Sequence, residues 1–156
     1  MAETIVELIG GHPLLEGLSP TDVEQVAGCS RNVVAEPGDI LFLEGDPATT
    51  LYLIRRGRVS LEVHAPGRGP LVIETVGPRS VVGWSWLFPP YRWNFTGRVT
   101  SPLGAVAVDG SCLRAKAEAD HELGFLLMRR FANLMLERLQ ATQLRVLDLY
   151  GDGPGR

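Results

Sequence analysis

Short apolar runs, each ended by turn residues, fill the middle of the chain and constrain its fold more than any other feature. Five such runs lie between residues 31 and 76, and two more follow near 96–101 and 104–109. Their spacing of about ten residues predicts a sandwich or barrel rather than alternating β and α units. Val59, Leu61 and Val63 alternate with polar residues, so we expect them to share the inward face of one strand.

Helical patterns flank this β region on both sides. Ser19, Pro20 and Asp22 form a helix start signal within the first 28 residues, which predicts a helix from 20 to about 28. After the strands, we expect Ser111 to cap a short helix and Asp120 to cap a long one that reaches Tyr150, where Gly151 stops it.

These boundaries predict a single domain of α+β class, mainly β, over residues 1–150. We expect a helical collar at 1–28, the β region at 31–109 and C-terminal helices at 111–150, followed by a disordered tail at 151–156.

Charge and hydropathy exclude several classes of function. The formal net charge of −3 supplies no basic field for a phosphate backbone, so we expect no direct nucleic-acid binding. The N-terminus lacks the basic start and apolar run of a signal peptide, and no apolar run is long enough to cross a membrane. We expect a cytoplasmic protein.

The two cysteines, Cys29 and Cys112, stand alone in the sequence. Neither belongs to a CxxC pair or lies near a second cluster of possible metal ligands. We expect both to be reduced residues of the core rather than a disulfide or a metal site.

The long C-terminal helix carries an apolar seam with alternating steps of four and three residues. A second apolar row beside it, Leu127, Phe131 and Leu134, is suited to packing on the β region. With both faces apolar, the pattern favours a homodimer through this helix, and the alternative is one wide apolar face on its own sheet. The seam, which is the predicted dimer interface, consists of Met128, Ala132, Met135, Leu139, Thr142, Val146 and Leu149.

Residues 83–95, GWSWLFPPYRWNF, gather aromatic side chains around a Pro-Pro pair. The prolines exclude a continuing helix or a central strand. A ligand site, a partner site and a plug in the core are all compatible with such a segment. More than half of the chain's Trp, Tyr and Phe residues lie here: Trp84, Trp86, Phe88, Tyr91, Trp93 and Phe95.

The order of parts and several turns resemble the cyclic nucleotide-binding domain of the catabolite activator (Crp-Fnr) and kinase regulatory subunit superfamily. The resemblance is carried by Pro37-Gly38-Asp39, by 44–48 (EGDPA), by 51–54 (LYLI) followed by Gly57, and by Val82-Gly83. It covers residues 12 to 150 and implies a β-roll (jelly roll) of about eight strands between a helical collar and a long C-terminal helix. Independently of the family, Gly38, Gly45 and Gly57 stand where tight turns between antiparallel strands are expected.

The resemblance also implies a phosphate-binding cassette at residues 83–96. In relatives that bind cyclic nucleotides, a Gly-Glu pair opens a short helix, and an Arg, a small polar residue and Ala about ten residues later meet the phosphate. Here Gly83 matches the glycine, Trp84 replaces the glutamate, and Asn94, Phe95 and Thr96 occupy the Arg, small polar and Ala positions. Both charged contacts are missing, so we expect cyclic AMP or cyclic GMP binding to be weak or lost.

The candidate ligand-binding residues are Gly83, Trp84, Ser85, Trp86, Arg92, Asn94, Phe95 and Thr96. Arg92, two residues early, replaces the missing arginine only if the Pro-Pro loop shifts the register. Two roles remain open for the rings: Trp84 and Phe95 fill the vacated pocket, or they line a new one for a flat ligand or a partner.

No constellation of residues suggests catalysis. His12, His64 and His121 are far apart and without metal-ligand spacing, so we expect turn or surface histidines and no cofactor, a cyclic nucleotide or other small effector excepted. The transcription factors of this superfamily carry a helix-turn-helix after the long helix, which does not fit in GDGPGR. Two hypotheses remain: a non-catalytic sensor domain that couples the pocket to a dimerising helix, and a ligand-free protein that docks a partner protein.

Overall fold

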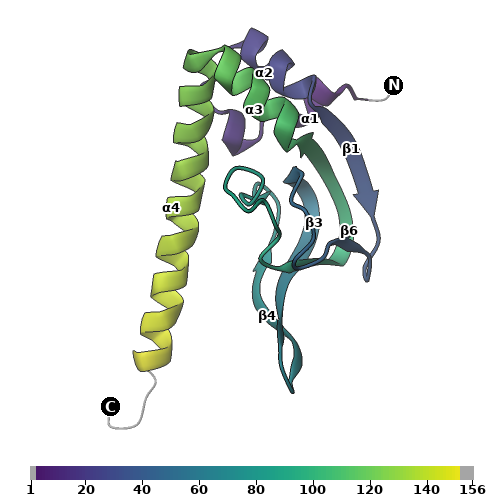
Figure 1. Cartoon of the computed structure of the whole chain (residues 1–156), viewed down its shortest axis with the longest axis vertical. Coiled ribbons are helices and arrows are strands. Elements are labelled where there is room, and N and C mark those ends of the chain that lie inside the picture. The colour runs from purple at the N-terminus through teal and green to yellow at the C-terminus, as the bar shows by residue number, and fades with distance from the viewer. Residues whose placement is uncertain (1–2, 152–156) are drawn as a thin grey trace.

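The structure is a computed structural model that describes residues 3–151. Figure 1 shows the short helices gathered at one end, the strands curving away from them, and the last helix running along one side of the sheet. Residues 152–156, most of the tail for which we expected disorder, lie outside the described residues.

The collar consists of α1 (Ile5–Ile9), a 3-10 helix η1 (Pro13–Leu15) and α2 (Pro20–Ala27). Ser19 caps α2 by accepting a hydrogen bond from Asp22 N, as its sequence signal predicted. His12 caps η1 from a turn, as expected, but it is buried, with 7% of its surface exposed. Its ring bonds to Leu14 N and to Ser80 O, so the collar is fastened to the loop before β5.

Six strands form one antiparallel sheet that curves into a roll. They are β1 (Ser30–Ala35), β2 (Ile40–Phe42), β3 (Thr50–Ala65), β4 (Gly69–Val76), β5 (Val81–Val82) and β6 (Thr96–Asp109). The order is β1-β6-β3-β4, with β2 paired to β6 and β5 paired to β3. The predicted fold class, mainly β with a collar and a long final helix, is confirmed.

Two of the expected strand boundaries are wrong. We expected Gly57 to separate two strands, and a break near residue 102, but β3 and β6 each run through. The strands pair with register shifts around Arg56 and Arg58, where Gly57 has a φ of 86°. A Cβ at Gly57 would collide with the carbonyl of Pro102 on β6. The glycine therefore permits a bend in two paired strands rather than a turn between separate ones.

Two helices follow the sheet, α3 (Gly110–Ala119) and α4 (His121–Gly151). The residue that caps α3 is Asp109, not Ser111 as expected: Asp109 Oδ1 accepts bonds from Cys112 N and Ser111 Oγ, both at 2.8 Å. Both bonds lower the pKa of the Asp109 carboxyl, and the bond from Cys112 N has the larger effect. Asp120 caps α4 through Leu123 N, as predicted.

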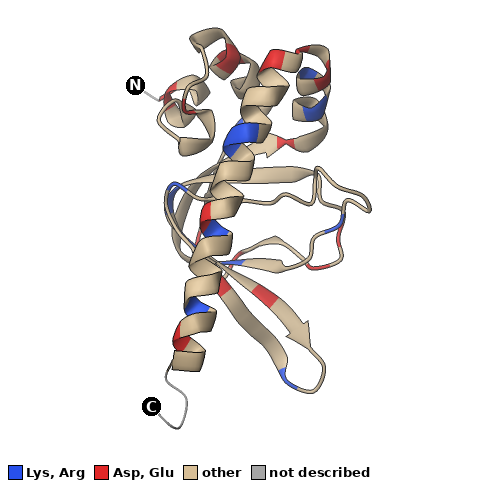
Figure 2. Cartoon of the chain, turned by 90° about the vertical axis from the view of Figure 1, so that its left-hand side faces the viewer, with Lys and Arg blue, Asp and Glu red and all other residues tan. Residues whose placement is uncertain are grey.

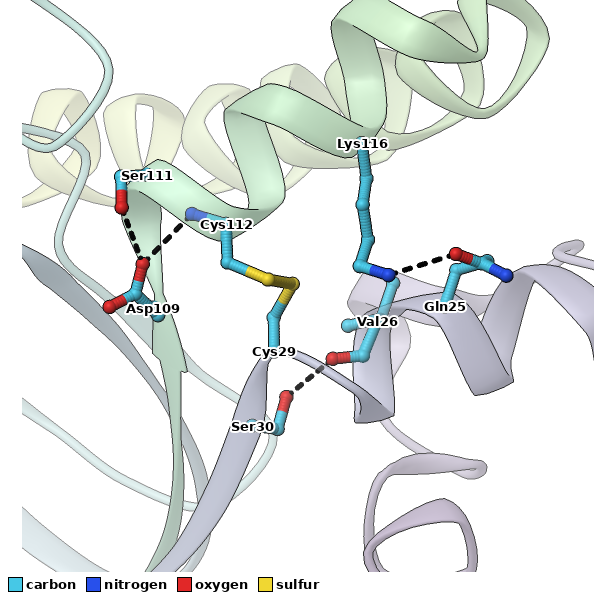
Figure 3. The surroundings of a disulfide bond; sticks show 8 residues. All are labelled: Gln25, Val26, Cys29, Ser30, Asp109, Ser111, Cys112 and Lys116. Atoms are coloured by element: carbon cyan, nitrogen blue, oxygen red, sulfur yellow. Dashed lines mark hydrogen bonds between the residues drawn. A yellow bond between two sulfur atoms is a disulfide. The ribbon is translucent and has the colours of Figure 1, made fainter.

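The prediction of reduced cysteines is wrong, because Cys29 and Cys112 form a disulfide (Figure 3). Cys29 lies between α2 and β1, and Cys112 lies in the first turn of α3. Strands β1 and β6 are paired, with Ser30 opposite Val108, and this pairing brings together two residues that are 83 apart in sequence. Sequence spacing alone gave no sign of it.

The buried apolar side chains form two clusters. The roll core fills the inside of the sheet and includes Phe42, Tyr52, Val59, Leu61 and Trp93, so Val59 and Leu61 face inward as predicted. The inward row does not continue to Val63, because the pairing of β3 with β4 shifts between Leu61 and Glu62; Glu62 is buried and Val63 is half-buried. The collar core lies between the sheet and the helices. It contains Leu14, Val26, Leu51, Trp86, Leu123, Leu127 and Phe131, among others.

Candidate functional site

The segment from Gly83 to Phe95 connects β5 to β6. Gly83 is buried and has a φ of 107°. A Cβ there would lie 2.8 Å from the Trp93 ring and 3.1 Å from Thr50 O. The glycine at the cassette position thus allows an aromatic ring of the same segment to pack directly against the backbone.

Trp93 of the cassette is buried in the roll core. Its ring stacks on Phe42 with centroids 3.7 Å apart and an interplanar angle of 9°, and Tyr52 lies 6.5 Å away. Burial raises the pKa of the Tyr52 phenol, with the Arg31 charge opposing the shift. Trp93 was noticed as an aromatic residue but was missing from our candidate site.

Trp84 and Phe95 cover the remaining space above this stack. Their rings meet edge to face at 6.2 Å. The cavity that they enclose with Leu61, Val82 and other neighbours measures about 10 Å³. That is at the lower limit for one water molecule and far below the several hundred Å³ of ordinary ligand pockets.

Arg138 of α4 lines the same cavity on the helix side. The sequence analysis did not identify this residue. Its guanidinium carbon lies 4.7 Å from the Trp84 ring centroid. Its nitrogens donate to Glu74 at 2.7 and 3.3 Å and to Val81 O at 3.0 Å. One side chain therefore joins α4, β4, β5 and the cassette, a role that no local motif signals.

The candidate cations do not enter the cavity. Arg92 is exposed and donates to Gly45 O at 3.0 Å, so the register shift that would replace the missing arginine does not occur. Arg98, the next cation along the chain, lies on β6 and pairs with the buried Glu62 at 3.0 Å. Asn94, at the cassette Arg position, is exposed.

The other candidate residues lie in three places. Gly83, Trp84, Ser85 and Phe95 line the closed cavity. Trp86 instead turns into the collar core, where it is 1% exposed, meets Phe131 edge to face and donates to Gly83 O. Thr96 accepts a bond from Glu44 N in the neighbouring loop.

The seam of α4 changes character along the helix. Met128 and Met135 pack against the collar core, whereas Leu139, Val146 and Leu149 are 55%, 44% and 77% exposed. Figure 2, viewed with α4 in front, shows the helix crossing the sheet and continuing beside the β3–β4 hairpin. The predicted second row does pack inward, since Leu127 and Phe131 are buried and Leu134 is half-buried. The alternative of one wide apolar face on the protein's own sheet fails for residues 139–150, all of which are exposed.

An open groove of about 670 Å³ separates the seam from the cassette. On the helix side it is lined by Met128, Ala132, Met135, Leu139 and Thr142, which are five of the seven seam residues. On the cassette side it is lined by Trp84, Leu87 and Phe88. The predicted interface and the aromatic segment are therefore neighbours in space.

Residues 3–151 contain no group of three or more His, Cys, Asp or Glu side chains suited to holding a metal ion. Among the helices of that part of the chain, none is long and apolar enough to span a membrane.

Comparison with known proteins connects this geometry to one family. Residues 32–135 match the cyclic nucleotide-binding domain. The CRP-like cAMP-activated global transcriptional regulator of Mycobacterium tuberculosis is 25% identical over 96% of this chain. The chain spans 66% of the length of that relative.

Two further relatives cover different shares of the chain. A putative cyclic nucleotide-binding protein from Geobacter metallireducens superposes with a TM-score of 0.77 and 27% identity, over 89% of this chain and 99% of that one. The acetyltransferase Pat of Mycolicibacterium smegmatis is 39% identical, but over only 43% of this chain and 20% of its own length. The family match spans most of the chain, from β1 to the middle of α4, and the chain belongs to the cyclic nucleotide-binding domain family.

Proposed function

We propose that the chain is a non-catalytic regulatory domain whose cyclic nucleotide pocket is closed by its own aromatic side chains. The observation that supports this most directly is the cavity of about 10 Å³ beneath Trp84 and Phe95. A cyclic nucleotide needs a pocket more than tenfold larger. Binding would have to expel both rings from positions in which they are already packed.

The polar contacts of the site argue in the same direction. Trp84 and Asn94 replace the Glu and Arg of the cassette, and each lost charge-assisted contact costs about 1.5–3 kcal/mol of binding free energy. The cations nearby, Arg92, Arg98 and Arg138, are bonded to Gly45 O, Glu62 and Glu74. Recruiting any of them for a phosphate would break these bonds.

In this proposal the domain acts through association rather than through ligand capture, and the partner is a second copy of the chain. The exposed half of α4 continues the seam that lines the groove, so a second α4 laid along it would cover Leu139, Val146 and Leu149. The alternating steps of four and three are the pattern by which two identical helices pack against each other. A symmetric dimer buries the same apolar residues on both chains.

The proposed setting is the cytoplasm, without a direct contact to nucleic acid or membrane. The negative net charge supports the absence of a nucleic-acid contact, and the likeness to a transcriptional regulator supports the cytoplasmic setting. A monomeric chain in the seam experiment described in the Discussion would instead favour another protein as the partner.

Titration calorimetry with cyclic AMP and cyclic GMP tests the closed pocket. We expect no heat from the wild-type protein at millimolar nucleotide. Trp84→Ala combined with Phe95→Ser removes both rings without adding charge and should still give no heat. Trp84→Glu combined with Asn94→Arg and Phe95→Ser removes both rings, supplies both charged cassette contacts and should bind. Micromolar binding by the wild-type chain would overturn the proposal and restore the alternative of a nucleotide sensor.

A further inference from the structure

The disulfide between Cys29 and Cys112 fastens the collar to the helices that follow the sheet (Figure 3). Cys29 follows α2 directly, and Cys112 lies in the first turn of α3. Their Cα atoms are 5.6 Å apart, within the range that ordinary disulfides span. Neither the closed pocket nor the proposed dimer uses this bond.

The disulfide lies at the joint where the connection from α2 to β1 meets the connection from β6 to α3, and several hydrogen bonds also hold this joint. Asp109 N donates to Cys29 O at 2.9 Å, and Ser30 pairs with Val108 in the sheet. Lys116 Nζ donates to Gln25 Oε1 at 2.9 Å, a second link between α3 and α2. Because these contacts do not involve sulfur, the joint is held in place without the covalent bond. Cleavage of the bond is therefore expected to loosen the joint without unfolding the domain.

A recess of about 320 Å³ gives solvent a route to this joint. Both cysteines line it, together with Arg31, Thr50 and Asp109. Cys112 is half-buried rather than fully enclosed. Arg31 supplies a positive charge in the same recess, and the Asp109 carboxylate supplies a negative one.

We propose that Cys29 and Cys112 form a reversible thiol–disulfide exchange site, reduced by a dithiol, whose redox state sets how firmly the collar is held to α3. A thiolate of the dithiol attacks one sulfur, forms a mixed disulfide and expels the other cysteine as a thiolate. The second thiol of the reagent then displaces the remaining cysteine. The protein gains two electrons and two protons, and the dithiol becomes a cyclic disulfide.

Contacts between α3 and α4 pass the state of this joint to the long helix. A Cβ on Gly124 of α4 would lie 2.8 Å from Ala117 O, so the two helices approach without a side chain between them. Arg130 of α4 donates to Pro13 O and Glu16 in the collar. The inference depends on the proposed cytoplasmic setting only for its physiological reductant, because disulfides in that compartment are commonly reversible.

The experiment combines thiol counting with hydrogen exchange on the full chain. Under native conditions, millimolar dithiothreitol should make both thiols reactive toward a mass tag. Subsequent treatment with oxidised glutathione should re-form the disulfide, so that neither cysteine takes the tag. Reduction should speed amide exchange about tenfold in α2 and the first turn of α3, while the paired amides of β3 and β6 stay unchanged. The double variant Cys29→Ala/Cys112→Ala should show the fast pattern with or without reductant.

Three results would overturn the inference: thiols that appear only in denaturant, oxidant that forms no bond, or equal exchange in both redox states. The thiol count on the wild-type chain decides the first two even if the double variant fails to fold. None of these readouts depends on nucleotide binding or on dimerisation. Failure here is thus distinct from failure of the proposed function.

Discussion

The two halves of α4 carry similar apolar patterns but have different surroundings. From Leu123 to Phe131 the helix is anchored, with Leu127 and Phe131 buried in the collar core and Arg130 bonded to the collar. From Leu139 to Tyr150 every residue is exposed. This includes the apolar residues Leu144, Leu147 and Leu149, each of which is more than half exposed. The difference shows that the repeat packs within the chain along the first half and leaves apolar side chains uncovered along the second, which is the surface of the proposed association.

The anchored half should respond most strongly to loss of a side chain. Phe131→Ala removes a ring that packs edge to face on Trp86, and it should lower the free energy of unfolding by about 3–5 kcal/mol. Leu144→Ala, at an exposed position outside the seam, is the matched control and should change it by less than about 0.5 kcal/mol. Urea denaturation at fixed protein concentration measures both. Equal decreases in the free energy of unfolding for the two variants would contradict the distinction between the two halves.

The exposed half should govern association instead. Leu139→Glu with Val146→Glu places charges in the proposed seam and should weaken dimerisation at least about 100-fold. Gln140→Glu with Leu147→Glu adds the same charge outside the seam, at positions turned by about 100° around the helix from Leu139 and Val146, and should leave the dimer intact. Light scattering over a dilution series reports both. A monomeric wild-type chain, or a dimer that persists in the seam variant, would contradict the proposed interface.

The collar beneath the anchored half should make that half sensitive to pH. Burial lowers the pKa of His12 from 6.5 to about 4, against the opposing bond to Ser80 O, so the folded state favours the neutral ring. The unfolded chain binds this proton between pH 6.5 and 4 while the folded chain does not. Stability is therefore full above pH 6.5 and declines as the pH falls toward 4, by roughly 3 kcal/mol at most.

His12→Asn keeps an acceptor for Leu14 N and removes the titrating group. It should flatten the decline in the free energy of unfolding between pH 6.5 and 4, whereas His64→Gln, at an exposed position on β3, should retain it. Parallel pH profiles for His12→Asn and the wild type would show that the buried ring is not the source.

Local signals predicted the elements well, because their causes lie within a few residues. The Ser19 cap, the Asp120 cap and the inward row of Leu127 and Phe131 each follow from short-range geometry. Gly57 misled the prediction, since a positive φ serves a bend as well as a turn. The same glycine pattern is compatible with one bent strand or with two.

The site was predictable only in part, because its decisive contacts join distant segments. The missing Glu and Arg of the cassette were visible in the sequence, and so was the option that Trp84 and Phe95 fill the space. Glu74 and Arg138 are 64 residues apart, and the two cysteines are 83 apart. Such pairs become neighbours only through the sheet, which no local pattern specifies.

Arg138 stands where the anchored half of α4 gives way to the exposed half, and its removal should have the smallest of these effects. The ion pair with Glu74 is mostly shielded, with side chains 20% and 23% exposed, and the guanidinium also covers Trp84. Arg138→Met keeps the aliphatic stem and should cost about 1–2 kcal/mol of unfolding free energy. Arg145→Met, on the exposed half, should cost less than about 0.5 kcal/mol.

Denaturation in the monomeric seam background separates this effect from association, and a double-mutant cycle with Glu74→Gln isolates the pair. A coupling free energy near zero would mean that the ion pair with Glu74 does not stabilise the helix. The aliphatic stem of Arg138 and its contact with Trp84 would then hold α4. The anchored half would be held by apolar packing that reaches Met135 rather than by the charge at Arg138. A coupling of about 1 kcal/mol places the boundary at Arg138, because only a formed ion pair makes the two substitutions non-additive.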